Sequence, residues 1–404
     1  MTVASRQKRT VAVVNVPARG TVCDEHGEVI LEHNRTKLVR AFSRSVEQCV
    51  SSGAPTISFR LSANKHGQIM SATGPITIQS LDMAYPGCGT ADEVLAADNA
   101  LDKAGATRGN SPAGRALDWA LRNDKKLAQW RVSRPLMEVF TRALYGGIQL
   151  GGEIKPNPKV NRVTLDIVSS YPFMAMQPLP RVRDAVIERG LRPHALLVKI
   201  AGQQNGPALF TRTDCGGTSY EEDVFGWYAR DEVDYHVDCG RLKVQTVMQS
   251  CTFPHSEKYL CPAVDHLFTH RERYPRNTPE RDVIKSALNG LLGKFASPIS
   301  TWRTPLPLEM EHAKRERHRS TIQLGASSLI NDLTLTGIYP RYCNVIWTTV
   351  TYARARVRLW QKMDEIVSAG GKVLWAHTDC VIADIPPTLR MQTGSALGDW
   401  RIVK

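Results

Sequence analysis

The chain has 404 residues, of which 42% are hydrophobic and 23% are charged, and its formal net charge is +13. This length is enough for two or three domains with a substantial core, and the composition is ordinary for a soluble globular protein. The excess of basic residues favours a polyanionic partner, with nucleic acid first, although a basic charge can also serve only solubility.

The cysteines and the N-terminus bear on the compartment. Nine cysteines are present and none forms a C-x-x-C pair, which argues against a zinc knuckle or a disulfide framework and for a reducing cytoplasm. No apolar segment follows the basic N-terminus, so we expect no signal peptide. No apolar run approaches the roughly 18 residues of a membrane span, so we expect no membrane partner.

Residues 1–135 are predicted to be a separate N-terminal region. Alternating apolar residues indicate strands first, and helical spacing follows later in the region. The predicted elements are strands over 10–16, 22–31, 56–61 and 76–78, a turn at 24–27, and helices over 91–104 and 113–130.

A glycine-rich segment and a strand come next. Residues 144–152 contain four glycines, which let the backbone approach another group closely, although a flexible hinge between domains is an alternative. In the predicted strand 162–168, alternate residues face opposite ways, so that Asp166 and Val168 share one face. A proline ends this strand and places Tyr171 just beyond the acid.

The helix that follows Thr278 is the most informative one. Thr278 is a good N-cap, and proline and acidic residues occupy the first turn. Arg281, Lys285 and Asn289 are spaced i, i+4, i+8, so they form a polar stripe opposite apolar residues, before a Gly-Lys turn at 293–294. The cations suit a triphosphate and the amide suits a base or sugar, whereas the alternative is an ordinary solvated helix face.

The segments around this helix are assigned from composition and spacing. Residues 184–262 alternate short strands with turns, and residues 263–274 have helical spacing. Residues 298–338 are rich in proline, serine and charge, so we predict an exposed insertion. Its basic cluster at 314–319 either touches nucleic-acid phosphates or is only solvated. A helix over 342–369 then leads into the last predicted element.

That last element is a hairpin with an acid at its tip. Two short apolar strands, 373–376 and 380–383, are joined by a turn that contains Asp379. One carboxylate holds Mg²⁺ weakly beside substrate phosphates, so Asp379 needs a partner, and Asp166 is the best candidate. A strand with one acid, followed far downstream by a hairpin with another, is the layout that two-metal phosphoryl transfer requires.

Four motifs in this order resemble those of family B DNA polymerases. They are Asp166-Ile-Val-Ser-Ser-Tyr-Pro172 for D-x-x-S-x-Y-P, Lys285-Ser-Ala-Leu-Asn-Gly-Leu-Leu-Gly-Lys-Phe295 for the fingers motif K-x-x-x-N-S-x-Y-G, His377-Thr-Asp379 for the D-T-D palm hairpin, and Tyr145-Gly-Gly147 for the glycine motif that joins exonuclease and polymerase parts. Gly293-Lys-Phe-Ala296 and Gly394-Ser-Ala-Leu-Gly-Asp-Trp400 most resemble the protein-primed branch of phages and linear plasmids. The resemblance covers residues 140–402.

The resemblance implies an α+β fold of the polymerase right-hand type, with an antiparallel palm sheet and helical fingers. It also implies a domain order. The expected parts are 1–135, a small α/β region that is reduced or degenerate as an exonuclease; 136–262, the first part of the palm with an inserted priming-type subdomain; 263–297, the fingers; 298–338, the exposed insertion; and 339–404, the second part of the palm with the metal-binding hairpin.

The implied activity is template-directed extension of a primer, with a protein hydroxyl as one candidate primer, by two-metal transfer from dNTPs. Asp166, Asp379 and the carbonyl of Ile167 would hold two Mg²⁺ ions, for which Mn²⁺ can substitute. Nucleotide contacts are expected from Tyr171, which would exclude a 2′-hydroxyl, and from Arg281, Lys285 and Asn289. DNA contacts are expected from Tyr145, Gly146, Gly147, Ser169, Ser170, Gly293 and Lys294.

The expected partners are template and primer DNA and dNTPs, with a terminal protein primer or a thumb-supplying subunit as further candidates. The expected location is the cytoplasm, which is that of a bacterial host if the protein is encoded by a phage or plasmid.

Several departures from the family pattern leave an alternative open. His377 replaces the first acid of D-T-D, Gly290 and Leu292 replace the Ser and Tyr of the fingers motif, and the chain stops at Lys404, before the thumb. The alternative is therefore a catalytically weakened, polymerase-like nucleic-acid-binding subunit that needs a partner for the thumb. A reverse transcriptase ranks lower, because Cys380 follows Asp379 where a second acid is usual. We also expect no proofreading and only short products from this chain alone.

Overall fold

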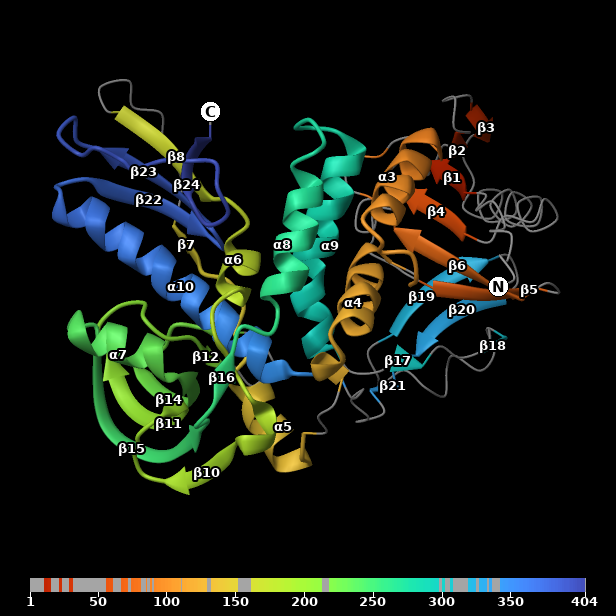
Figure 1. Cartoon of the computed structure of the whole chain (residues 1–404). Coiled ribbons are helices and arrows are strands. Elements are labelled where there is room, and N and C mark those ends of the chain that lie inside the picture. The colour runs from red at the N-terminus through yellow and green to blue at the C-terminus, as the bar shows by residue number, and fades with distance from the viewer. Residues whose placement is uncertain are drawn as a thin grey trace. The chain divides into compact units, whose positions relative to one another are not determined.

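The structure, a computed structural model (Figure 1), divides into two compact units. The first unit comprises Met1–Trp119, His266–Gly290 and Pro298–Tyr339, and the second comprises Ala120–Asp265, Leu291–Ser297 and Pro340–Lys404. The described residues are 11–15, 22–23, 29–31, 56–60, 67–71, 74–80, 85, 88, 91–109, 111–128, 132–151, 161–212, 218–297, 300–301, 306–307, 319–324, 327–332, 334–335 and 342–403.

A six-stranded mixed sheet forms the N-terminal part of the first unit. Its order is β3-β2-β1-β4-β6-β5, and β4 pairs in parallel with both β1 and β6. The strands are β1 (Val11–Asn15), β2 (Val22–Cys23), β3 (Val29–Leu31), β4 (Thr56–Arg60), β5 (Gly67–Ser71) and β6 (Gly74–Ser80). The predicted strands are therefore confirmed in place, while the predicted turn at 24–27 lies outside the described residues.

The helices that lie wholly or partly in the first unit are α3 (Ala91–Lys103), α4 (Pro112–Asn123), α8 (Cys261–Arg271) and α9 (Pro279–Ala296). The predicted helix over 113–130 is too long, because α4 ends at Asn123. The Asp124 carboxylate there accepts a hydrogen bond from the backbone N–H of Lys126 (2.8 Å), and such short polar side chains favour turns over helix interiors. A 3₁₀ helix, Lys125–Ala128, follows.

The segment predicted as an insertion contains short strands. β17 (Ser300–Thr301) pairs with β21 (Thr334–Leu335), and β20 lies between β18 and β19 in a three-stranded sheet. These last three strands are β18 (Leu306–Pro307), β19 (Arg319–Leu324) and β20 (Ser327–Asp332). Positions 308–318, which hold most of the predicted basic cluster, lie outside the described residues.

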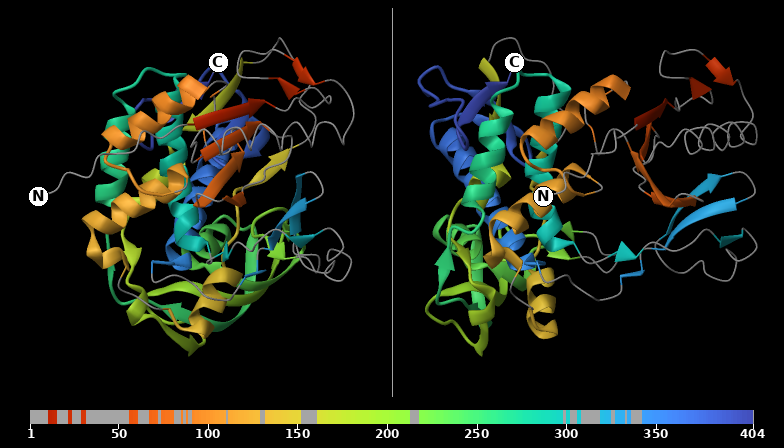
Figure 2. Two further views of the ribbon diagram at one scale, coloured as in Figure 1. Left: turned by 90° about the vertical axis from the view of Figure 1, so that its right-hand side faces the viewer. Right: turned by 45° about the vertical axis from the view of Figure 1, so that its right-hand side comes forward.

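The second unit is built on a five-stranded antiparallel sheet of order β24-β8-β23-β22-β7. Helix α10 (Val345–Ser368) covers one face of it (Figure 1, with two further views in Figure 2), where its Leu359 and Met363 pack in one core with strand residues such as Leu165 and Val381. The strands are β7 (Gln149–Gly151), β8 (Asn161–Ile167), β22 (Lys372–His377), β23 (Cys380–Ile385) and β24 (Trp400–Val403).

A second antiparallel sheet has the order β10-β15-β11-β14. Along the chain, its strands come after β7 and β8 and before β22, β23 and β24 of the core sheet. Its strands are β10 (Val186–Arg189), β11 (Ala195–Gln204), β14 (Asp223–Ala229) and β15 (Leu242–Thr252), and α7 (Arg230–Asp238) packs against it. The remaining elements are α5 (Arg134–Arg142), α6 (Ser170–Ala175), η2 (Val182–Asp184) and the short pairs β9 (Leu179–Pro180) with β16 (Ser256–Glu257) and β12 (Thr211–Arg212) with β13 (Thr218–Ser219).

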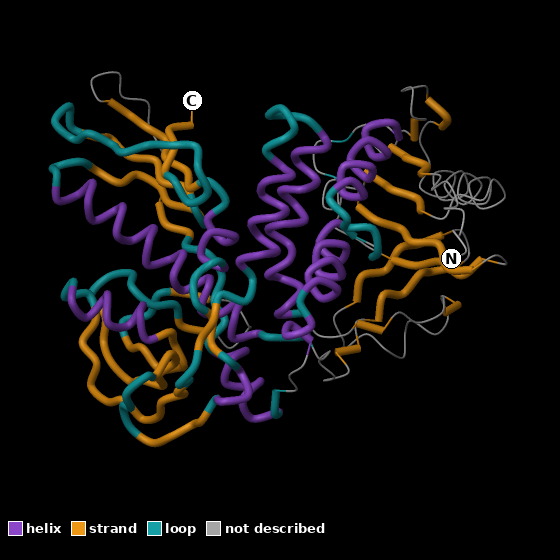
Figure 3. Tube along the Cα trace, viewed as in Figure 1, coloured by secondary structure: helices purple, strands orange, loops and turns teal. Residues whose placement is uncertain are grey.

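The structure combines helices with mostly antiparallel sheets (Figure 3), so the predicted α+β class is confirmed. No helix among the described residues is both long enough and apolar enough to cross a membrane.

Candidate active site

Strand β8 carries Asp166 on the sheet face that α10 leaves uncovered. Val163, Leu165 and Ile167 are buried, whereas Thr164 and Asp166 are only partly buried, as the alternation of a half-buried strand requires. The prediction that Val168 shares the face of Asp166 is wrong, since Val168 is 6% exposed. The strand ends at Ile167, and Ser169 adopts a left-handed conformation with φ of 52°, so the alternation stops there.

The tip of the β22–β23 hairpin lies beside the end of β8. The backbone N–H of Ile167 donates to the carbonyl of Asp379 (3.0 Å), and Cys380 is the cross-strand partner of Asp166. Burial, together with the negative charges of Asp166 and Asp379, raises the pKa of the Cys380 thiol to about 11. The structure therefore brings the two predicted acids to the same end of one sheet.

The glycine motif packs directly against this hairpin tip. The backbone N–H of Thr378 donates to the carbonyl of Ile148 (2.8 Å). A Cβ at Gly147 would lie 2.9 Å from the Cα of Thr378 and 3.0 Å from the Tyr171 hydroxyl, which is closer than side chains tolerate. Glycine at 147 thus lets the segment, the hairpin and Tyr171 meet.

Tyr171 is held in a defined orientation next to the acids. Its ring lies 4.4 Å from that of Tyr352, measured between centroids. Burial raises the pKa of Tyr171, and Tyr352 and Asp379 raise it further, so the phenol stays neutral at physiological pH. The ring is therefore an uncharged group with a fixed orientation beside the hairpin tip.

Buried side chains hold the glycine motif, residues 145–147, in place. Tyr145 is 4% exposed and stacks on Tyr228 with centroids 5.4 Å apart. The Arg356 guanidinium donates to the carbonyls of Tyr145 and Gly146, each at 2.8 Å, and both its remaining nitrogens bind Glu232 at 2.6 and 2.7 Å. The Tyr145 side chain is therefore part of the core, which leaves the backbone of the motif to make any DNA contact.

The two serines after Asp166 differ in environment. Ser169 is partly buried and carries the left-handed turn between β8 and α6. Ser170 is 1% exposed, and its hydroxyl has no hydrogen-bond partner among the described residues. Of the two, only Ser169 retains exposed surface for a ligand.

The polar stripe on α9 is confirmed for two of its three members. Lys285 and Asn289 are exposed, while Val283 and Leu288 behind them are buried. The predicted N-cap is confirmed as well, because the backbone N–H of Arg281 donates to the Thr278 hydroxyl (3.4 Å).

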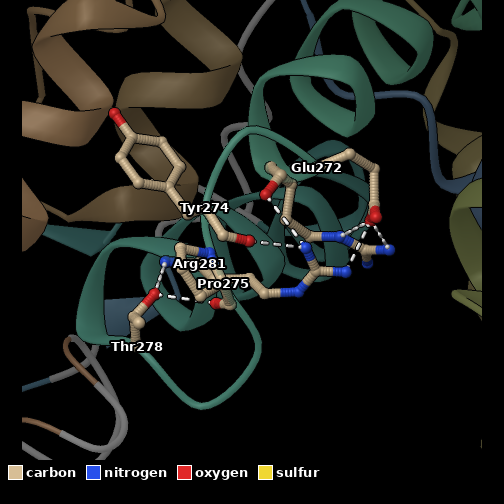
Figure 4. Close-up of polar contacts among 6 residues, drawn as sticks. Glu272, Tyr274, Pro275, Thr278 and Arg281 are labelled. Carbon is tan, nitrogen blue, oxygen red and sulfur yellow. Dashed lines mark hydrogen bonds and ion pairs between the residues drawn. The ribbon is translucent and has the colours of Figure 1, made fainter.

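Arg281, the third member of the stripe, bonds within the protein instead (Figure 4). Its guanidinium donates to the carbonyls of Arg271 (3.2 Å) and Tyr274 (2.9 Å) and to the Glu272 carboxylate (2.7 Å). Although partial burial opposes the effect, hydrogen bonds from Arg271 and Arg281 lower the pKa of Glu272. Arg281 thus closes the turn between α8 and α9, and Lys285 and Asn289 are left as the open polar positions.

The end of α9 explains the departures from the fingers motif. A Cβ at Gly290 would lie 2.5 Å from the Cβ of Ala113, so no larger residue fits there. Leu292 is 1% exposed and packs in the core. Gly293 borders open space, and burial lowers the pKa of Lys294.

His377 occupies the position of the first acid of the D-T-D motif, and its side chain is not buried. It is exposed and stacks on Trp375 with centroids 5.3 Å apart. Its Nε2 lies 3.3 Å from the Gln149 amide nitrogen, and its Nδ1 lies 3.3 Å from the Thr378 hydroxyl. The imidazole is thereby held at the hairpin tip next to Asp379.

The donor atoms of this site fit a hard divalent cation. Carboxylate and backbone carbonyl oxygens are the ligands that Mg²⁺ prefers, and Asp166, Asp379 and Ile167 offer them at one end of the sheet. The described residues contain no cluster of three or more His, Cys, Asp or Glu side chains that could hold a metal. Such an open set of oxygens matches a cation shared with substrate phosphates.

Three residues of this site lie outside the recognised motifs. Arg356 and Glu232 form the buried pair behind the glycine motif, and Arg401 binds Asp166. The sequence signals were weak, because Arg356 is one of several charged residues in its helix, whereas Arg401 is a basic residue within a short apolar strand.

An antiparallel sheet that brings two carboxylates to one end defines a candidate site for metal-dependent phosphoryl transfer. A family model described as DNA polymerase type B, organellar and viral, matches residues 122–337, more than half of the chain. The chain therefore belongs to the type B DNA polymerases, and its enzyme class is DNA-directed DNA polymerase.

Similar folds occur among solved structures, although no curated protein matches the chain. Phi29 DNA polymerase in an orthorhombic crystal form has a TM-score of 0.60 and 14% identity, over 94% of this chain and 80% of that one. Its complex with primer-template DNA gives 0.62 and 11%, over 89% and 77%. Its ternary complex with primer-template DNA and incoming nucleotide gives 0.59 and 12%, over 94% and 80%.

Proposed function

We propose that this chain extends a primer along a DNA template by two-metal nucleotidyl transfer from dNTPs. The observation that carries the proposal is the hydrogen bond between the N–H of Ile167 and the carbonyl of Asp379. It joins the end of β8 to the hairpin tip, and both acids are then available to one substrate. When bound, two Mg²⁺ ions, or Mn²⁺ in their place, would supply Lewis-acid stabilisation of the attacking hydroxyl and the leaving pyrophosphate.

The chain's own residues receive the following roles in the proposal. Asp166, Asp379 and the Ile167 carbonyl hold the ions, and Tyr171 excludes a ribose 2′-hydroxyl. Lys285 and Asn289 contact the incoming nucleotide, while Arg281 shapes the turn that presents their helix. DNA contacts are assigned to the backbone of Tyr145, Gly146 and Gly147 and to Ser169, Gly293 and Lys294, whereas the predicted contact from Ser170 is dropped because that side chain is buried.

The proposed partners are a primer, a template and dNTPs. The solved phi29 DNA polymerase complexes contain primer-template DNA and, in the ternary complex, incoming nucleotide, which supports the same ligands for a chain of similar fold. A terminal protein as primer is proposed on the resemblance alone, as is action in a bacterial cytoplasm.

Binding and synthesis measured on the same DNA test this proposal. A labelled primer-template is titrated with the protein for fluorescence anisotropy, and the complex then receives dNTPs with Mg²⁺ or with EDTA. We expect extension only with Mg²⁺ and only by the base complementary to the template. Tight binding without any extension would instead support the weakened, non-catalytic subunit.

Replacing Lys285 by Ala should raise the KM for dNTP by about tenfold, because one cation contact to a phosphate is worth about 1.4 kcal/mol at a partly exposed site. Steady-state incorporation across a dNTP titration measures this effect. The matched control is Lys372→Ala, which removes an exposed lysine at the far end of the β22–β23 hairpin and should leave KM unchanged. An unchanged KM in Lys285→Ala would mean that the polar stripe is an ordinary solvated helix face.

Replacing Tyr171 by Val should admit ribonucleotides about 10- to 100-fold more readily, because a filled pocket rejects an added hydroxyl by steric exclusion of about that size. The readout is the ratio of kcat/KM for a dNTP to that for the matching rNTP. Tyr171→Phe keeps the ring and should keep the ratio, which separates exclusion by the ring from any role of the hydroxyl. If the ratio in Tyr171→Val equals that of the wild type, another residue selects the sugar.

A further inference from the structure

A permanent cation lies directly opposite Asp166. Arg401 on β24 is the cross-strand partner of Asp166, and its Nε and Nη2 donate to the same carboxylate oxygen, Oδ2, at 2.9 and 2.5 Å. The side chains are 37% and 19% exposed, respectively. The Arg401–Asp166 ion pair is therefore made by short, charge-assisted hydrogen bonds at a partly desolvated site.

This contact affects any other cation at the same carboxylate. A guanidinium keeps its charge at all physiological pH values and cannot be neutralised by proton loss. While it is bound to Asp166 it cancels much of the carboxylate charge, and it repels a divalent ion that approaches the same group. Both of its bonds end on Oδ2, and the other oxygen of Asp166 accepts no hydrogen bond from the described residues.

We propose that Arg401 is a tethered cation that competes with the divalent metal for the Asp166 carboxylate and so lowers the metal affinity of the enzyme without substrate. This proposal rests on the proposed function, in which Asp166 is a metal ligand. Arg401 is then a residue that tunes the metal site from the neighbouring strand, rather than a residue that contacts the reacting atoms.

The same sheet contains a matched control pair. Arg162 and Asp384 are also cross-strand partners, on β8 and β23, and they form a two-pronged ion pair at 2.8 and 3.1 Å. Their side chains are 24% and 16% exposed, which resembles the Arg401–Asp166 pair. Neither residue belongs to the proposed metal site, so loss of Arg162 tests the effect of removing an arginine from this sheet.

The test is a Mn²⁺ titration of the protein without DNA or nucleotide, with free Mn²⁺ measured by electron paramagnetic resonance. Arg401→Gln should bind Mn²⁺ about three- to tenfold more tightly than the wild type, since it removes one partly screened charge beside the site. Arg401→Lys keeps the charge, so its Mn²⁺ affinity should stay close to that of the wild type. Arg162→Gln should also bind Mn²⁺ with the affinity of the wild type. Arg401→Met is a second neutral variant that keeps the aliphatic stem, and circular dichroism verifies the fold of each.

Two results would overturn the proposal, and they differ in what else they affect. If neither neutral variant binds Mn²⁺ more tightly while Asp166→Asn loses binding, the competing role of Arg401 is wrong and the proposed metal ligand stands. If Asp166→Asn binds Mn²⁺ as the wild type does, Asp166 is not a ligand, and the proposed function and this inference fail together.

Discussion

Replacing Asp379 or Asp166 by Asn should lower the single-turnover rate of nucleotide incorporation on the order of 10³-fold, because each change removes a charge that stabilises the transition state in a preorganised site. Binding of primer-template should change little, since phosphate contacts elsewhere supply most of the sequence-independent affinity. Rapid-quench incorporation of one dNTP measures the rate, and anisotropy measures DNA binding for the same preparations.

The control for this prediction is Asp384→Asn on the same hairpin. Asp384 is also a partly buried acid on β23, but it is bound to Arg162, whose hydrogen bond lowers the pKa of Asp384. Its loss should cost some stability and leave the chemical step within a few-fold of the wild type. Equal losses of rate in Asp384→Asn and Asp379→Asn would mean that the hairpin acids act through folding and not through catalysis.

Replacing Arg356 by Met should destabilise the second unit by about 3–5 kcal/mol, because it leaves the buried Glu232 carboxylate without its partner. Arg356 and Glu232 are each 2% exposed, and the change also removes the donors to the carbonyls of Tyr145 and Gly146. The midpoint of denaturant unfolding, followed by tryptophan fluorescence, reports the loss.

Arg241→Met is the matched control for this second prediction. Arg241 pairs with Asp364 on the same helix α10, at 2.7 Å, but these side chains are 20% and 34% exposed. Partly exposed pairs contribute about 1 kcal/mol or less, so this variant should lose much less stability. If Arg356→Met unfolds at the same denaturant concentration as Arg241→Met, the Arg356–Glu232 pair does not anchor the glycine motif.

Local periodicity was sufficient to predict most of the elements that carry the site. Alternation in β8 placed Asp166 on the uncovered face, and helical spacing in α9 placed Lys285 and Asn289 opposite buried residues. These features depend on neighbours in the sequence, which is why pattern analysis can find them. The prediction for Val168 failed because β8 ends at Ile167, one residue before it, and the alternating pattern does not mark that end.

The pairings of the charged residues could not be predicted in this way. Arg281 has the spacing of a ligand-binding stripe, yet its guanidinium bonds to the end of the preceding helix. The Arg356–Glu232 and Arg401–Asp166 pairs join residues 124 and 235 positions apart. Their geometry is set by the tertiary fold, so composition and local spacing contain no information on which acid each arginine meets.

The central claim is that this chain copies a DNA template with the two carboxylates at the end of the sheet. The most direct measurement is incorporation of a single nucleotide on four primer-templates that differ only in the templating base, by the wild type and by Asp379→Asn, with Mg²⁺. We predict that the wild type adds only the complementary dNTP in each case and that the variant adds essentially none. Incorporation that ignores the templating base, or that proceeds equally fast in Asp379→Asn, would contradict the account.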